Sequence, residues 1–174
     1  YETHVIALMI LGFIYPVLGR LDDARSAIDR TVSLCEKHGD MLHLVGAINN
    51  RALYRAYRGD RAGMHADFMR VLSLARELGH RTPELFAHYN LAEYLMLMDD
   101  VDAAEPHAKR ALAIEEHRAG SAGRPVVVLL AARIALYRGD EASARRIVSE
   151  IRAHQLDARA ANRAMKASSL ESIS

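Results

Sequence analysis

The amino-acid sequence repeats itself at an offset of 40 residues. A column of turn-forming residues falls at that spacing, at Gly19, Gly59, Asp99 and Gly139. Glycine, and less often aspartate, tolerates the left-handed backbone that ends one helix before the next begins. A fixed period of this length is typical of repeat architectures, in which each period forms one supersecondary unit. The period therefore constrains the fold more than any other feature of the chain.

Each period predicts two helices joined by a tight turn. Small residues recur before the turn, at Gly12, Ala52, Ala92 and Ala132, and large apolar residues recur beside them, at Ile14, Tyr54, Tyr94 and Ile134. A second column follows the turn, at Ala24, Met64, Ala104 and Ala144. Apolar residues at intervals of four continue this column as a stripe on one helical face. One hairpin cannot bury such a stripe alone, so successive hairpins must stack. The predicted fold is all-α, a superhelical solenoid of helical hairpins.

We expect four hairpins and a short capping helix in a single array. The predicted helices span residues 2–18 and 21–38, 41–58 and 61–78, 82–98 and 101–118, and 125–138 and 141–154. They form units of about 1–40, 41–80, 81–120 and 121–156, followed by a cap at 157–167 and a frayed tail at 168–174. Because the chain begins at Tyr1 and not at Met, we expect it to be a segment of a longer protein.

Composition excludes several classes of function. The 23 basic and 22 acidic residues leave a formal charge of +1, so no global field attracts nucleic acid or an anionic membrane. The single cysteine, Cys35, cannot form an internal disulfide, which favours a cytoplasmic location, and we expect its thiol to be buried or half-buried. The sequence contains no zinc-ligand spacing, phosphate-binding loop or hydrolase motif. We therefore expect no metal, no cofactor and no enzymatic activity.

The repeating residues resemble tetratricopeptide repeats. The positions that carry the resemblance are Leu11, Gly12, Tyr15, Ala24, Ile28, Phe68, Asn90, Leu91, Ala92, Ala104 and Ala144. Three features depart from the family: the period is 40 and not about 34, the closing proline is absent, and Met64 takes the place of a small residue. Longer units of this kind are similar to the repeat arrays of large bacterial regulatory proteins. The resemblance implies a protein-interaction module.

The resemblance also implies that the first helix of each hairpin lines a concave groove for a peptide or a partner domain. The expected lining is mostly apolar with a few polar side chains, at Met9, Phe13, Asn49, Asn50, Tyr57, Phe86, Tyr89, Asn90, Glu93, Arg133 and Tyr137. In family members that bind peptides, asparagine at the position of Asn50 and Asn90 holds the ligand backbone, because an amide offers both a donor and an acceptor. The alternative is that both asparagines bond to neighbouring helices, because polar groups near an interface need partners.

Two groups of side chains are expected to be structural. Arg51, Arg55 and Arg58 follow a helical spacing that is typical of a solvated ridge. The nine histidines are scattered, and only a few approach helical spacing with acids, as Glu84 and His88 do. We interpret the histidines as surface or capping residues.

The first predicted helix is apolar on almost every side between Val5 and Leu18. At this length, and with Pro16 inside it, the helix cannot span a membrane, which needs about 20 apolar residues. An all-round apolar helix needs burial on several sides, so we expect a preceding repeat or a second copy of the chain to cover it.

Two alternative functions stay open beside peptide binding. One is a regulatory domain that senses a signal or a small ligand, and the other is a dimerisation segment.

Overall fold

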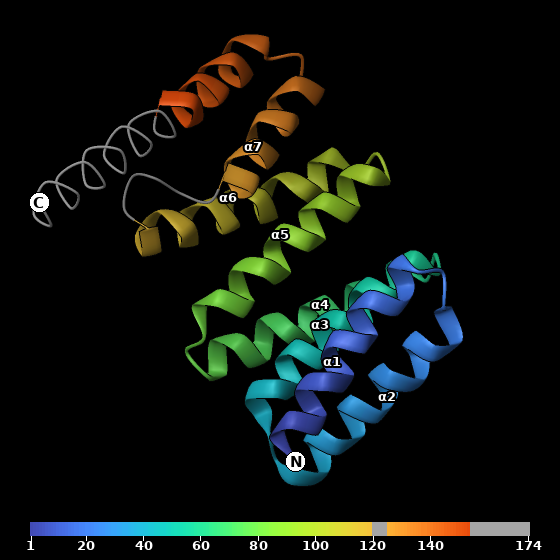
Figure 1. Cartoon of the computed structure of the whole chain (residues 1–174). Helices are drawn as coiled ribbons and strands as arrows, with labels where there is room; N and C mark the ends of the chain where they lie inside the picture. Colours follow the sequence, from blue (N-terminus) through green and yellow to red (C-terminus); the bar gives the residue numbers. More distant parts are fainter. Residues whose placement is uncertain (120–124, 154–174) are drawn as a thin grey trace, which may run out of the picture. The chain divides into compact units, whose positions relative to one another are not determined.

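The computed structural model describes the backbone of residues 1–119 and 125–153, and all of them lie in helices and the turns between them (Figure 1). The helices are α1 (Glu2–Val17), α2 (Leu21–His38), α3 (Met41–Tyr57), α4 (Arg61–Glu77), α5 (Arg81–Leu97), α6 (Val101–Ala119) and α7 (Pro125–Tyr137), and residues 141–153 are also helical. The all-α prediction is confirmed, and the predicted bounds of α1 to α7 agree with the structure to within one residue. The predicted cap at 157–167 and tail at 168–174 lie outside the described residues.

The chain divides into two compact units, Tyr1–Ala111 and Leu112–Ser174. The boundary falls inside α6, so the first unit holds α1 to α5 and the beginning of α6. The second unit holds the end of α6, α7 and the helical residues 141–153.

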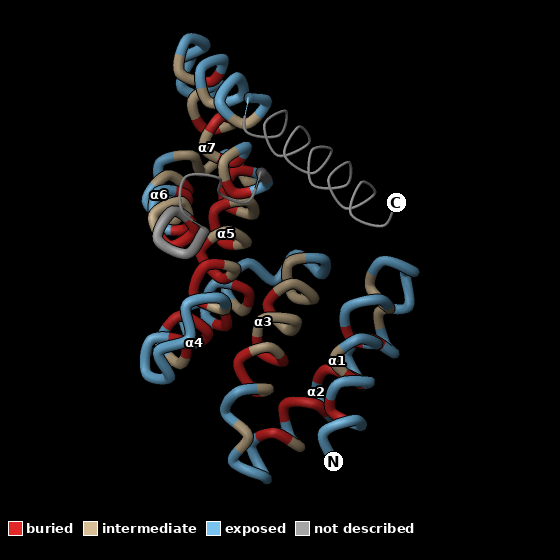
Figure 2. Tube along the Cα trace, turned by 60° about the vertical axis from the view of Figure 1, so that its left-hand side comes forward, coloured by how far each residue is buried: buried red, intermediate tan, exposed pale blue. Residues whose placement is uncertain are grey.

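Two kinds of contact build the first unit. Each helix from α1 to α4 packs against the next one along the chain, and α3 also packs against both α1 and α5. The first helices of the hairpins therefore form a row, α1, α3 and α5, with α2 and α4 packed against its members. As a consequence of this packing, the buried residues lie on the sides of the helices that face a neighbouring helix (Figure 2).

Left-handed residues end the helices at the predicted column. The backbone angle φ is 72° at Gly19, 73° at Gly59, 61° at Asp99 and 75° at Gly139. The residue after each of these donates its N–H to a carbonyl five residues earlier, as Asp60 does to Arg55 at 2.9 Å. This pattern satisfies carbonyls that the helix end leaves without partners. The side chain of Asp60 then accepts the N–H of Gly63 at 2.9 Å and so caps the next helix.

The small-residue columns are buried, as close helix packing requires. Ala52 and Ala92 are fully buried, and a Cβ atom added to Gly12 would lie 2.8 Å from Cγ1 of Ile28. Met64, the departure from the family pattern, is fully buried as well, so the second hairpin accommodates a large residue in the small column. Cys35 is buried as predicted, and burial raises the pKa of its thiol.

Candidate peptide-binding groove

Two adjoining cavities follow the row of first helices in the first unit. One has a volume of about 230 Å³ and the other about 340 Å³, and side chains of α1, α3 and α5 line both. Phe13, Asn50, Leu53 and Asn90 belong to both linings, so the cavities are continuous. We refer to the two cavities together as the groove.

The structure places most of the predicted site residues in the groove. The predicted residues that line it are Met9, Phe13, Asn49, Asn50, Tyr57, Phe86, Asn90 and Glu93. Tyr89 is half-buried on α5 and lines neither cavity. Arg133 and Tyr137 lie on α7, which belongs to the second unit, and the lining of the groove comes from the first unit.

The repeat pattern does not identify two tyrosines of the groove as binding residues. Tyr54 and Tyr94 belong to its column of large packing residues, yet both are half-buried and line the smaller cavity. The ring of Tyr94 packs against Phe68, with ring centroids 6.4 Å apart, so one residue serves the core and the cavity. Tyr54 lies three residues before Tyr57, which is about one helical turn. That spacing could have placed both tyrosines on one face.

Asn50 and Asn90 connect successive first helices. The Nδ2 of Asn50 donates to the backbone carbonyl of Met9 at 3.1 Å, and the Nδ2 of Asn90 donates to Oδ1 of Asn49 at 3.3 Å. The side-chain NH2 groups therefore bond to neighbouring helices, which supports the alternative that the two asparagines have a structural role. The side-chain oxygens differ, because the Oδ1 atoms of Asn50 and Asn90 accept no hydrogen bond from another described residue. Both oxygens are therefore available to a ligand in the groove.

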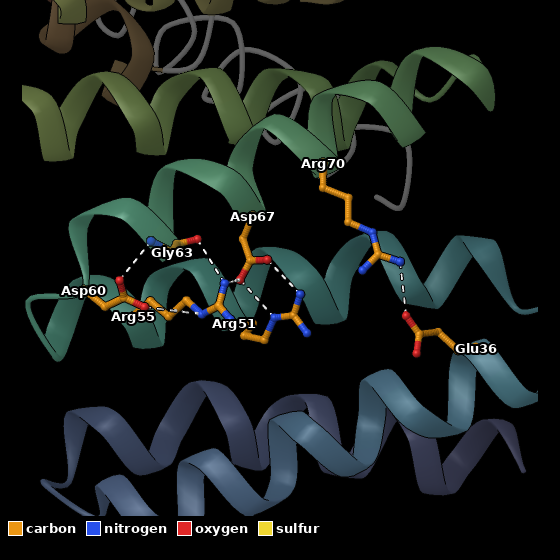
Figure 3. Close-up of polar contacts among 7 residues, drawn as sticks. All are labelled: Glu36, Arg51, Arg55, Asp60, Gly63, Asp67 and Arg70. Carbon is orange, nitrogen blue, oxygen red and sulfur yellow. Dashed lines mark hydrogen bonds and ion pairs between the residues drawn. The ribbon is translucent and has the colours of Figure 1, made fainter.

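An ion-pair cluster joins α3 to α4 (Figure 3). Asp67 is 3% exposed, and Arg51 binds its carboxylate with two atoms, Nε at 2.9 Å and Nη2 at 2.7 Å. Nη1 of Arg55 lies 2.8 Å from the same carboxylate and also donates to the carbonyl of Gly63 at 3.1 Å. The interpretation of Arg51 and Arg55 as part of a solvated ridge is wrong, because both bind the buried Asp67 of α4. Of the three arginines, only Arg58 is exposed.

A histidine pair joins the two helices of the third hairpin, and His107 occupies the repeat position of Asp67. The Nδ1 atoms of His88 on α5 and His107 on α6 lie 2.9 Å apart, so one ring must donate a proton and the other must accept it. His88 is 5% exposed, and its buried Nε2 has no hydrogen-bond partner among the described residues. The interpretation of the histidines as surface or capping residues is therefore wrong for His88.

The surroundings of the pair disfavour its protonated form. Burial lowers the pKa of His88 to about 4, and a proton on His107 and the charges of Arg76 and Arg110 act in the same direction, while Glu84 opposes them. Burial also lowers the pKa of His107, with His65 as the second cause. Both rings are therefore neutral at pH 7.

The described residues give no support for a metal centre or a membrane span. In residues 1–119 and 125–153, no three side chains of His, Cys, Asp or Glu are placed to hold a metal ion. No helix in the same part of the chain has both the length and the apolar character that crossing a bilayer requires.

Comparison with known proteins identifies a fold and no family. No protein-family model matches the sequence, and no curated protein matches it. Among solved structures, the crystal structure of BtubC (BKLC) from P. vanneervenii is similar, with a TM-score of 0.76 and 17% sequence identity. The match covers 89% of this chain and 64% of the BtubC chain. At this identity the likeness shows the fold alone, so the chain shares an all-α helical architecture with BtubC.

Proposed function

We propose that this chain is a non-enzymatic protein-interaction module of the tetratricopeptide type, and that its groove binds a peptide segment of a partner protein. The observation that carries the proposal is the continuous groove along α1, α3 and α5. Binding sites are typically concave and mostly apolar, with a few placed polar groups. The groove has this composition, because aromatic and aliphatic side chains surround the acceptor oxygens of Asn50 and Asn90.

Exposed apolar side chains at the groove supply the binding energy in this proposal. Phe13 is 58% exposed and Val17 is 67% exposed, although both lie in an otherwise folded unit. Covering the exposed part of a phenylalanine stabilises a complex by about 1–2 kcal/mol. Aromatic residues near the centre of an interface often contribute more than their neighbours. Phe13 lines both cavities, so we expect it to be the strongest single contributor.

The test is a selection of random 12-residue peptides displayed on phage, followed by measurement of Kd for the selected peptides. We expect Phe13→Ala to weaken their binding by roughly tenfold, which corresponds to about 1.4 kcal/mol. The matched control is Met69→Ala, which removes an exposed apolar side chain of α4 outside the groove. Equal Kd values for the wild type and Phe13→Ala would contradict the proposal.

A second candidate function, dimerisation, is favoured by the exposed face of α1. The repeat aligns Ile6 and Ile10 with Gly46 and Asn50, and these two residues of α3 contact Met9 of α1. Ile6 and Ile10 therefore occupy positions that a preceding helix covers elsewhere in the unit, yet they are 42% and 52% exposed. Figure 2 shows α1 mostly in the colour of exposed residues. A second copy of the chain is a partner that could cover this face.

Light scattering tests dimerisation directly. The candidate predicts a doubled mass for the wild type and the mass of one chain for Ile10→Asp, because a buried carboxylate at the centre of the face opposes association. A single-chain mass for the wild type at high protein concentration would exclude it. Phe13→Ala serves as the comparison variant. It should weaken peptide binding, whereas Ile10→Asp should abolish dimerisation, so the two candidate functions respond to different substitutions.

A further inference from the structure

The smaller cavity of the groove contains more hydrogen-bond acceptors than donors. The amide nitrogens of Asn50 and Asn90 already donate to other groups of the protein, which leaves their Oδ1 atoms as acceptors. Glu93 adds a carboxylate, which accepts hydrogen bonds and donates none when ionised. A carboxylate offers about four lone-pair sites, so Glu93 can accept from a ligand in addition to its contacts within the protein. A ligand that bonds to these oxygens therefore supplies hydrogen-bond donors.

Aromatic rings surround the same acceptors. Tyr54, Tyr57 and Tyr94 line the smaller cavity together with Phe13. The three tyrosine hydroxyls make no hydrogen bond to another described residue, so each can accept a hydrogen bond from a ligand and can also donate one. The pKa of Tyr94 is raised by burial and then by the negative charges of Tyr57 (when ionised) and Glu93, which line the same cavity. Aromatic faces attract cations, and desolvation in a cavity strengthens the attraction.

The charge of the lining points in the same direction. Glu93 is the one charged residue among those that line the two cavities, and no lysine or arginine lines either of them. An acidic peptide would therefore meet no basic partner in the lining. A lysine ammonium or an arginine guanidinium carries only donors and a positive charge, which complements both the acceptors and the rings.

We propose that the smaller cavity, formed by Phe13, Tyr54, Tyr57, Tyr94 and Glu93, binds a lysine or arginine side chain of the partner peptide, while the larger, apolar cavity binds its aliphatic neighbours. This inference rests on the proposed peptide-binding function and gives the partner a chemistry: a basic residue flanked by apolar ones. Arginine is the better fit, because its planar group stacks on aromatic faces and can bind a carboxylate with two nitrogens.

The first arm of the test compares two small probes, N-acetyl-arginine-methylamide and its citrulline analogue, which has a similar shape and no charge. Binding is followed by the NMR signals of the tyrosine rings. We expect the arginine compound to bind at least roughly fivefold more tightly than the citrulline compound. Glu93→Gln should abolish that preference, and Tyr57→Leu should reduce it by roughly two- to fivefold. Asp22→Asn, which removes an exposed carboxylate of α2 outside the groove, should leave it unchanged.

The second arm examines the peptides from the phage selection. We expect lysine or arginine next to aliphatic residues in the selected sequences, and loss of that enrichment when Glu93→Gln protein is the target. Peptides that depend on Phe13 but show no basic enrichment would overturn the cation site and leave the proposed function standing. Peptides that do not depend on Phe13 would overturn the proposed function, and the two probes would then decide the cation site alone. Equal binding of the arginine and citrulline probes overturns it.

Discussion

Acidification from pH 7 to pH 5 should destabilise this protein through the buried pair of His88 and His107. The sign follows from the burial of His88, which lowers its pKa in the folded state from 6.5 to about 4. The unfolded chain therefore binds a proton more readily than the folded chain, and stability falls as the pH decreases below 6.5. The loss levels off only below about pH 4, where the folded state becomes protonated as well.

The size of the loss follows from the same two pKa values. Between pH 7 and pH 5, the unfolded state gains about 0.7 of a proton at this site, while the folded state gains about a tenth of one. Integration over this interval gives a loss of about 2 kcal/mol in the free energy of unfolding. The pKa of His107 is also lowered, so its contribution has the same sign.

Urea unfolding followed by circular dichroism at both pH values measures this loss, and the repeat supplies the control variant. Ile48 occupies the position of His88 in the preceding hairpin and is fully buried, so His88→Ile places a proven core residue at the site. We expect the variant to lose about 2 kcal/mol less than the wild type between pH 7 and pH 5, because His88 accounts for that part. Equal losses in the two proteins would refute the argument that burial of His88 controls the acid response.

Three further substitutions test the packing of the hairpins, each by its free energy of unfolding in urea. Asp99→Gly should stabilise the protein by up to about 1 kcal/mol. Asp99 is the non-glycine residue of the described chain with a positive φ, a backbone conformation that glycine adopts with less strain. Unchanged stability would exclude strain at this position. Asp67→Asn should cost about 2 kcal/mol, because Arg51 loses its charged partner, and a cost below 0.5 kcal/mol would show that water replaces the carboxylate. Gly12→Val should cost about 1–3 kcal/mol through overlap with the buried Ile28, whereas a neutral result would show that α1 can move away.

The sequence was sufficient to predict the helices and their turns, because these depend on local spacing. The turn column contains Gly59 and Asp99, and the left-handed φ at both positions follows from the 40-residue period. The row of first helices could be predicted for the same reason, since the period repeats the contact positions of each hairpin. Most of the expected groove residues therefore lie together in the structure.

The polar pairs could not be predicted, because each one joins two helices. The repeat position of Asp67 holds Ala27 in the first hairpin and His107 in the third, so the period reveals no common polar role. The partner of Arg51 is set by how α3 meets α4, and spacing along α3 alone shows a row of cations. The orientation of the Asn50 amide depends on where the Met9 carbonyl of α1 lies along α3. The sequence alone does not determine this position, because it depends on how α1 packs against α3.

The most direct test of the groove is the location of a bound peptide on the protein. A selected peptide, titrated into isotopically labelled protein, should shift the NMR signals of the residues shared by the two cavities, Phe13, Asn50, Leu53 and Asn90. Signals of α2 and α4 outside the lining should move little. Shifts confined to α2 and α4, with the four shared residues unchanged, would contradict a binding groove along α1, α3 and α5.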